Sequence, residues 1–131
     1  MFVIKPIQSK EEQKDCCLRC AIPYIKEDLA YQAVSDGQFS AIAQFRIESG
    51  VGIIDHIVSL PGTNEWEMMF IMGRQTLNYI DLCGTHVCRA ASDAGEEKLL
   101  LSIGFKKADD GSYFIDLHGL FDGCAHSHPT L

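Results

Sequence analysis

The chain has 131 residues, of which 47% are apolar and 22% are charged, and its formal net charge at pH 7 is −7. These values are typical of one globular domain with a full hydrophobic core, and the negative charge argues against a nucleic-acid-binding surface. No apolar run reaches the roughly 18 residues of a membrane span. Because the amino terminus also lacks the apolar core of a signal peptide, we expect a cytoplasmic protein that binds no membrane.

The first segments predict a strand and a helix. Residues 2–7 alternate weakly between apolar and polar side chains, as in a short strand. Ser9 and Glu12 have the spacing of a capping box, which predicts a helix of about three turns that ends near Ala21. Pro23 either ends this helix or begins a second helical segment.

An antiparallel meander of three strands is predicted next, at residues 30–34, 39–48 and 51–60. Turn residues separate the strands, with Asp-Gly at 36–37 and Ser-Gly at 49–50. Strict alternation predicts that one face of the second strand carries Phe39, Ala41, Ala43, Phe45 and Ile47.

A long helix is predicted after the meander. Residues 61–64 break the third strand, and Asn64 has the position of a helix N-cap, with Glu67 three residues later. The apolar residues that follow have helical periodicity, and Gly84 has the position that ends a helix. Residues 85–91 then predict another strand.

The last predicted elements are a short helix and a hairpin. Ser92 or Asp93 caps the helix, and Gly104 ends it. Two strands follow, at residues 105–108 and 112–117, and an Asp-Asp-Gly turn joins them.

The complete order of elements is β-α-(α)-β-β-β-α-β-α-β-β. It predicts one α+β domain over residues 1–121 with a mixed, mostly antiparallel sheet, followed by a tail at 122–131. In residues 99–117, LLLSIGFKKADDGSYFIDL, the pair Gly104-Phe105 stands at a helix-to-strand corner. This segment and the order of elements resemble the GNAT superfamily of acetyl-CoA-dependent N-acetyltransferases.

The resemblance implies a splayed sheet, in which the strand at 51–60 diverges from the strand at 85–91 and acetyl-CoA binds in the opening. The cofactor diphosphate would lie against amides at the start of the next helix. The family's diphosphate-binding loop has glycines where this chain has Trp66 and Met68. The backbone amides of residues 62–64 are therefore the candidate substitute for that loop. The cofactor-binding residues that the resemblance implies are Val58, Leu60, Gly62, Thr63, Asn64 and Asp93.

The resemblance also implies direct acyl transfer to an amine, with a carboxylate or an ordered water as proton acceptor. Asp55 and His56, in the middle of the long strand, are the candidate bases, and a neutral histidine suits this task. Adjacent strand residues face opposite sides, so we expect only one of them to face the cleft, and the alternative is a structural polar pair. Leu100 takes the position of the family's thiolate-protonating tyrosine. Tyr113 is the nearest alternative phenol, unless it is only a packed strand residue.

The six cysteines are expected to be reduced thiols, because the sequence shows no export signal. Cys17, Cys20, Cys124, His126 and His128 include enough thiols and imidazoles for a Cys₂His₂ set that would suit zinc. The alternative is that the thiols pack on the inward stripe of a helix and the histidines belong to a polar tail. We expect this alternative, and no metal site.

Three functions follow from these patterns. The first is an N-acetyltransferase that uses acetyl-CoA and acts on a small-molecule or peptide amine. The second is a catalytically inactive GNAT-fold module that binds or regulates a partner, and the partner can be a second copy of the chain. The third is a zinc-stabilised structural domain. The partner surface of the second function would consist of Trp66, Met68, Met69 and Met72.

Overall fold

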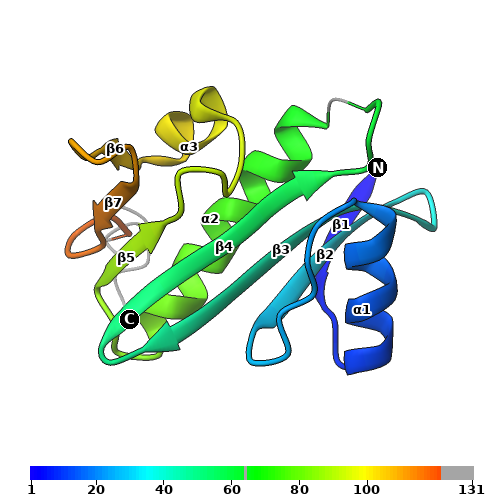
Figure 1. Ribbon diagram of the computed structural model, residues 1–131, viewed down its shortest axis with the longest axis horizontal. Coiled ribbons are helices and arrows are strands. Elements are labelled where there is room, and N and C mark those ends of the chain that lie inside the picture. The colour runs from blue at the N-terminus through cyan, green and yellow to red at the C-terminus, as the bar shows by residue number, and fades with distance from the viewer. Residues whose placement is uncertain (64, 122–131) are drawn as a thin grey trace, which may run out of the picture.

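The central element of the fold is a seven-stranded sheet with the strand order β1-β2-β3-β4-β5-β7-β6 (Figure 1). The computed structural model describes residues 1–63 and 65–121, and the predicted tail at 122–131 lies outside them. The strands are β1 Phe2–Pro6, β2 Leu29–Ser35, β3 Gln38–Glu48, β4 Val51–Ser59, β5 Val87–Ala90, β6 Lys106–Lys107 and β7 Tyr113–Asp116. The helices of the described part are α1 Lys10–Arg19, α2 Trp66–Leu82 and α3 Glu97–Ile103. Paired strands are antiparallel except β4 and β5, which are parallel, so the predicted mixed α+β architecture is confirmed.

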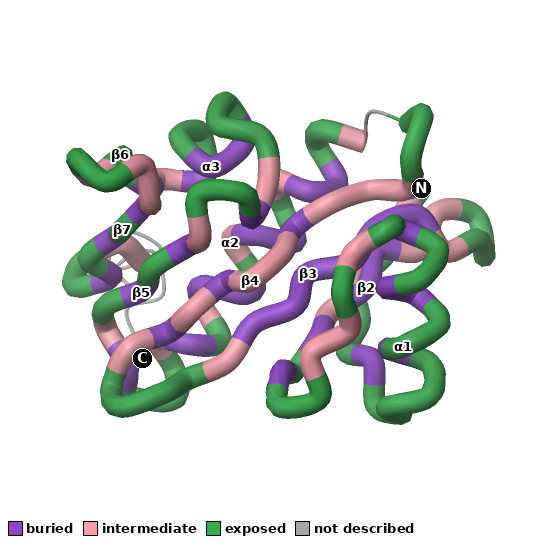
Figure 2. Tube along the Cα trace, in the orientation of Figure 1, coloured by how far each residue is buried: buried purple, intermediate pink, exposed green. Residues whose placement is uncertain are grey.

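Helices cover both faces of the sheet, with α1 on one face and α2 and α3 on the other (Figure 1). Beneath α1, Cys16, Cys17 and Cys20 pack with Ile42, so the predicted inward orientation of these thiols is confirmed. The middle of β3 is buried on both faces, because it lies between the two helical layers (Figure 2). The larger core cluster, beneath α2 and α3, includes Ala43, Phe45, Leu77, Ile80 and Leu100.

The helix α2 passes close to α3 and β4 at Gly73. A Cβ atom at this position would lie 2.4 Å from Cδ1 of Ile103 and 3.2 Å from Cδ1 of Ile57. Glycine is therefore the residue that lets these elements approach without displacing either isoleucine.

The same packing buries the methionines of α2. Met68, Met69 and Met72 are 5%, 4% and 0% exposed, whereas Trp66 is 40% exposed. The predicted partner surface is therefore wrong, because the methionines face the sheet and belong to the core. Among the described residues, no helix is both long and apolar enough to cross a bilayer.

The amino-terminal helix begins where the sequence predicts. The hydroxyl of Ser9 accepts a hydrogen bond from the backbone N–H of Glu12 at 3.2 Å. The helix ends at Arg19, and residues 21–28 form an irregular loop. The alternative of a second helical segment after Pro23 is therefore wrong.

The starts of the other two helices differ from the predictions. At α2 the N-cap is Glu65, which makes no side-chain capping bond, and the predicted cap Asn64 lies outside the described residues. At α3 the N-cap is Glu96, so the predicted cap at Ser92 or Asp93 is wrong. The residues before Glu96 are instead hydrogen-bonded to β4.

A β-bulge in β3 changes the predicted alternation. The register between β2 and β3 shifts by one residue and leaves Ser40 without a partner on β2. Phe39 consequently turns to the α1 side, where its ring centroid lies 5.1 Å from Cζ of Arg19. The prediction that Phe39 shares a face with Ala41 is therefore wrong. A second register shift, between β3 and β4, lies at the candidate site.

Candidate active site

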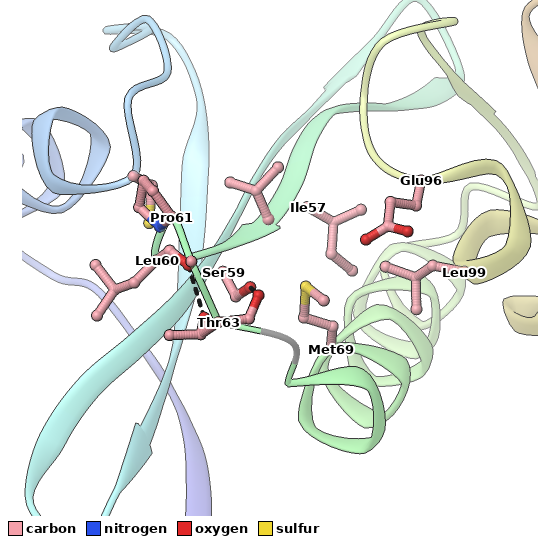
Figure 3. Close-up of a pocket in the computed structure, with 11 residues that line it drawn as sticks. Ile57, Ser59, Leu60, Pro61, Thr63, Met69, Glu96 and Leu99 are labelled. Carbon is pink, nitrogen blue, oxygen red and sulfur yellow. Dashed lines mark hydrogen bonds between the residues drawn. The ribbon is translucent and has the colours of Figure 1, made fainter.

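The strands β4 and β5 diverge after a short parallel contact. They pair only over residues 52–54 and 88–90, and β4 then continues to Ser59 without a β5 partner. A pocket of about 280 Å³ opens beside the end of β4 (Figure 3). The splay that the sequence predicts is therefore present.

This pocket brings together four of the predicted cofactor-binding residues. Its lining includes Val58, Leu60, Gly62 and Thr63, with Met69, Glu96 and Leu99 opposite Leu60 (Figure 3). Asp93 is not part of the lining, and Asn64 lies outside the described residues. The role of all six residues in binding a cofactor stays a prediction.

Donors for a diphosphate at this pocket are partly used within the chain. Thr63 directs its N–H and its hydroxyl to the carbonyl oxygen of Leu60, at 3.1 and 2.6 Å. Glu65, the N-cap of α2, makes no side-chain capping bond, so among the described residues no N-cap side chain takes the first-turn amides away from an anion. Glu67 in that turn and Glu96 in the pocket act against a negative ligand.

The segment between β5 and α3, residues 91–96, is hydrogen-bonded to β4. The N–H of Ile57 donates to the carbonyl oxygen of Ala94 at 2.7 Å. A Cβ atom at Gly95 would lie 2.8 Å from the carbonyl oxygen of Ile57, so the backbones are in close contact. The segment thus lies against the part of β4 that follows the pairing of β4 with β5. It takes up the backbone N–H of Ile57. This attachment also explains why α3 begins late.

A β-bulge in β4 places Asp55 and His56 on the same face of the sheet. The register between β3 and β4 shifts by one residue at this point and leaves Asp55 without a partner on β3. Asp55 contacts Arg46, and His56 contacts Gln44. Gln44 and Arg46 are two residues apart on β3 and share one face. The premise that Asp55 and His56 face opposite sides of the sheet is therefore wrong, and neither residue is part of the pocket lining.

The sequence matches no protein-family model and no curated protein. Solved structures nevertheless superpose over most of the chain. An N-acetyltransferase from Staphylococcus aureus Mu50 has a TM-score of 0.69 and 13% identity, and covers 91% of this chain and 99% of its own. A GNAT family acetyltransferase from Brucella melitensis in complex with acetyl-CoA has a TM-score of 0.67 and 15% identity, and the match covers 88% of each chain. The ribosomal-protein-S18-alanine N-acetyltransferase from Escherichia coli has a TM-score of 0.65 and 16% identity, and covers 87% of this chain and 91% of its own.

The chain has the GNAT fold. The predicted resemblance is confirmed at the level of architecture. Identities this low do not transfer an activity, because one fold carries many functions. The chemistry of this GNAT-fold chain must therefore be argued from its own side chains.

Gln44 determines which nitrogen of His56 carries the proton. Its Oε1 accepts hydrogen bonds from Nε2 of Gln13 (2.9 Å) and from the N–H of Ile25 (3.1 Å). Its Nε2 therefore faces the other way and donates to the carbonyl oxygen of Pro23 (2.9 Å) and to Nδ1 of His56 (3.0 Å). Since Nδ1 accepts this bond, the neutral ring carries its proton on Nε2.

The environment of His56 favours this neutral ring. Burial lowers its pKa below the ordinary 6.5, although Asp55 and Asp93 act in the opposite direction. Near pH 7 the imidazole therefore offers an N–H donor at Nε2 rather than a free lone pair. Of the two candidate bases, Asp55 is the one whose chemistry suits proton acceptance.

Asp28 is a site residue that the sequence analysis missed. Its side chain is completely buried, and both carboxyl oxygens lack a hydrogen-bond donor among the described residues. Nη1 of Arg46 lies 3.6 Å from Oδ1 of Asp28 and also contacts Oδ2 of Asp55. Burial, and then contact with the Asp55 carboxyl, raise the pKa of Asp28 to about 8. At neutral pH Asp28 is thus mainly protonated.

Tyr113 lies away from the pocket lining in this GNAT-fold chain. Its side chain is buried, and its hydroxyl donates to Oε1 of Glu97 at 3.2 Å. Lys107 donates to the same oxygen at 2.8 Å. Leu100, at the position of the family's tyrosine, is completely buried in the core. An acid role for Tyr113 stays a prediction.

The described cysteines of α1 are structural. Burial raises the pKa of Cys16 and Cys17 to about 11 and that of Cys20 to about 12, so these thiols stay protonated. Cys124 and the two histidines that follow it lie outside the described residues. Within residues 1–63 and 65–121, no group of three or more ligating side chains could hold a metal ion.

Proposed function

We propose that the protein is an N-acetyltransferase that uses acetyl-CoA and acts on a cationic small-molecule or peptide amine. The observation that carries this proposal is the bulge at Asp55, which puts a carboxylate and a neutral imidazole side by side where β4 leaves β5. The cofactor is supported by the Brucella melitensis protein of the same fold, whose structure is a complex with acetyl-CoA.

The pocket at the end of β4 fits the thioester arm of acetyl-CoA. Ile57, Leu60, Met69 and Leu99 give it apolar walls, which suit an acetyl group and an alkyl chain. The first turn of α2, where Glu65 makes no side-chain capping bond, supplies amides for the diphosphate. Bound acetyl-CoA supplies the thioester from which the acetyl group is transferred.

The acceptor amine would lie on the α1 side of β4. Asp55 and Asp93 both act electrostatically on His56, so this side carries negative charge that attracts an ammonium group. A carboxylate oxygen of Asp55 accepts the ammonium proton, directly or through one water, and as the C–N bond forms and the C–S bond breaks the second amine proton passes to the departing thiolate, which leaves as coenzyme A thiol. Nε2–H of His56 donates to the oxygen that gains negative charge during transfer. Arg46 and protonated Asp28 hold the Asp55 carboxylate in place.

The segment at residues 91–96 favours a second candidate, a GNAT-fold binding module without catalysis. The carbonyl of Ala94 takes the N–H of Ile57, and this bond must open before β4 can offer that amide to a ligand. A ligand other than acetyl-CoA could use the same pocket with the segment in place.

Incubation of the protein with acetyl-CoA and a panel of primary amines separates the two candidates. The acetylated amine should be followed by mass spectrometry, because the exposed Cys83 would react with thiol reagents. We expect product from the wild type, and a loss of kcat with retained acetyl-CoA binding in Asp55→Asn. Asp109→Asn, which changes an exposed turn carboxylate, is the matched control. Binding without product for any amine would favour the module, and failure to bind would reject the cofactor.

A further inference from the structure

The outward face of α2 carries a stripe of apolar and amide side chains. The helix covers one side of the sheet (Figure 1), and its buried residues belong to the core on that side. On the opposite side of the helix, a stripe follows three- and four-residue spacing at Ile71, Gln75, Asn78 and Leu82. Ile71 and Leu82 are 39% and 76% exposed. The stripe therefore exposes apolar area at both ends and amides in the middle.

A shallow hollow of about 480 Å³ runs along this stripe, and all four stripe residues line it. The rings of Tyr31 and Tyr79 border it on the β2 side, 6.3 Å apart. Arg74 borders it on the α3 side, where its Nε donates to the carbonyl oxygen of Ile103 at 2.7 Å. The described lining holds no carboxylate, although the chain has 18 acidic residues and a net charge of −7. Two copies can therefore meet here without bringing negative charges together.

The stripe is complementary to itself when two α2 helices pack antiparallel. In a pair with twofold symmetry, residue i faces residue j of the partner, and j faces i. An axis that passes midway between residues 76 and 77 brings Ile71 to the partner's Leu82 and Gln75 to the partner's Asn78. Apolar side chains then pack on apolar ones. Amides, which both donate and accept, pair with amides.

The charges on one flank of the stripe match in the same packing. Arg74 and Asp81 are seven residues apart, which is about two turns, so they lie on one flank of α2. The twofold axis keeps this flank on the same side in both copies. It brings Arg74 to within about 3 Å, along the helix, of the level of the partner's Asp81. Among the described contacts, Asp81 uses Oδ1 for His86 and Arg74 uses Nε for Ile103, so Oδ2 and both Nη atoms remain for this contact.

We propose that the protein forms a symmetric homodimer through the outward face of α2, with Arg74 of each copy paired to Asp81 of the other. A standard stable interface buries about 800 Å² per partner. The stripe from Ile71 to Leu82 is one helix face roughly 17 Å long, so the dimer should be weak, with a Kd on the order of micromolar. The hollow shares no lining residue with the pocket beside β4, and dimerisation is therefore independent of acyl transfer.

Analytical ultracentrifugation of the untagged full chain, without acetyl-CoA, tests this interface over a range from low to high micromolar concentration. We expect the average mass to rise from one chain to two and no further, because a twofold interface closes on itself. Leu82→Glu should abolish the rise, since it puts a carboxylate against the partner's Ile71. Leu18→Glu is the matched control, because Leu18 is 77% exposed on α1, on the other side of the sheet.

Charge reversal separates a contact between copies from a structural role within one chain. Arg74→Glu and Asp81→Arg should each weaken self-association by roughly tenfold, because both symmetric contacts then join like charges. In an equimolar mixture of the two variants, each contact of the mixed dimer joins opposite charges. The mixture should therefore associate about as tightly as the wild type. Mixing would not repair a defect inside each chain.

Circular dichroism of each variant checks that the fold is retained. A monomer at every concentration would overturn the proposal, as would a mass that rises beyond two chains. Association that survives Leu82→Glu, or that Leu18→Glu removes as well, would place the contact elsewhere and overturn it. Failure of the mixed charge variants to associate would overturn the assigned pairing of Arg74 with Asp81.

Discussion

The carboxyl groups of Asp28 and Asp55 lie beside the same guanidinium, because Nη1 of Arg46 is 3.6 Å from Oδ1 of Asp28 and also contacts Oδ2 of Asp55. Two adjacent carboxylates in a buried place repel each other, so one of them keeps a proton. Asp28 is the more buried of the two and holds that proton.

Asp28→Asn should change how stability depends on pH. The pKa of Asp28 rises from 3.8 to about 8 on folding. Its contribution to stability is therefore complete at low pH and is lost as pH rises toward 8, at up to about 1.4 kcal/mol per pH unit. The neutral amide lacks this loss, so the variant should gain stability relative to the wild type between about pH 5 and pH 8.

Urea denaturation across this pH range measures the effect. Arg46, Asp55 and Cys17 are the ionisable groups that act on Asp28 or are acted on by it, and all three are retained in the variant. Asp109→Asn is the control, since it alters an exposed turn carboxylate. Parallel pH profiles for Asp28→Asn and the wild type would contradict the shared-proton arrangement.

His56 should be neutral, with its proton on Nε2, at pH 7. Two-dimensional NMR of the imidazole nitrogens reports this tautomer, and a pH titration should give a pKa below 6.5. Gln44→Glu replaces the donor at Nδ1 of His56 with a carboxylate oxygen. This variant should move the proton to Nδ1 and raise the pKa of His56. The same tautomer in both proteins would refute the assigned orientation of Gln44.

Gly73→Ala should destabilise the fold by about 1–3 kcal/mol, because the added methyl group meets Cδ1 of Ile103 in a close-packed core. Ile103→Val removes that atom. In a double-mutant cycle the pair should cost less than the sum of the two single changes, by at least about 0.5 kcal/mol. Additive effects would show that the α2–α3 contact is looser than the geometry indicates.

Gly95→Ala should detach residues 91–96 from β4. Its Cβ atom would lie 2.8 Å from the carbonyl oxygen of Ile57, which the backbone can relieve only by moving. The amide of Ile57, now bonded to Ala94, should then exchange its hydrogen faster. If the segment limits access to β4, this variant should also bind acetyl-CoA more tightly. Unchanged exchange at Ile57 would show that the segment does not close the opening.

The order of elements could be predicted from the sequence because turn residues and caps mark nearly every boundary. Ser9 and Gly104 act at the helix ends as predicted. The bulge at Asp55 could not be predicted, since the apolar pairs 53–54 and 57–58 on either side of Asp55 and His56 fit either register. The pairing with β3 decides between the two registers.

Asp28 and the late start of α3 also escaped prediction, for related reasons. Asp28 follows two charged residues in a loop, which is the pattern of a solvated turn, and only the packing of the 21–28 loop buries it. Ser92 and Asp93 are good capping residues, but the hydrogen bond between Ile57 and Ala94 holds the chain away from a helical start. Local propensity was overridden in both cases by contacts with distant strands.

Acetyl-CoA should bind at the end of β4, and Asp55 should then serve the transfer of its acetyl group. The most direct test is thermal unfolding of the full chain with millimolar acetyl-CoA, compared for the wild type, Asp55→Asn and Leu60→Glu. Leu60 lines the pocket, so its replacement by a carboxylate should block binding. The Tm should rise for the wild type and Asp55→Asn and should stay unchanged for Leu60→Glu. No rise in the wild type, or an equal rise in all three proteins, would refute this binding site.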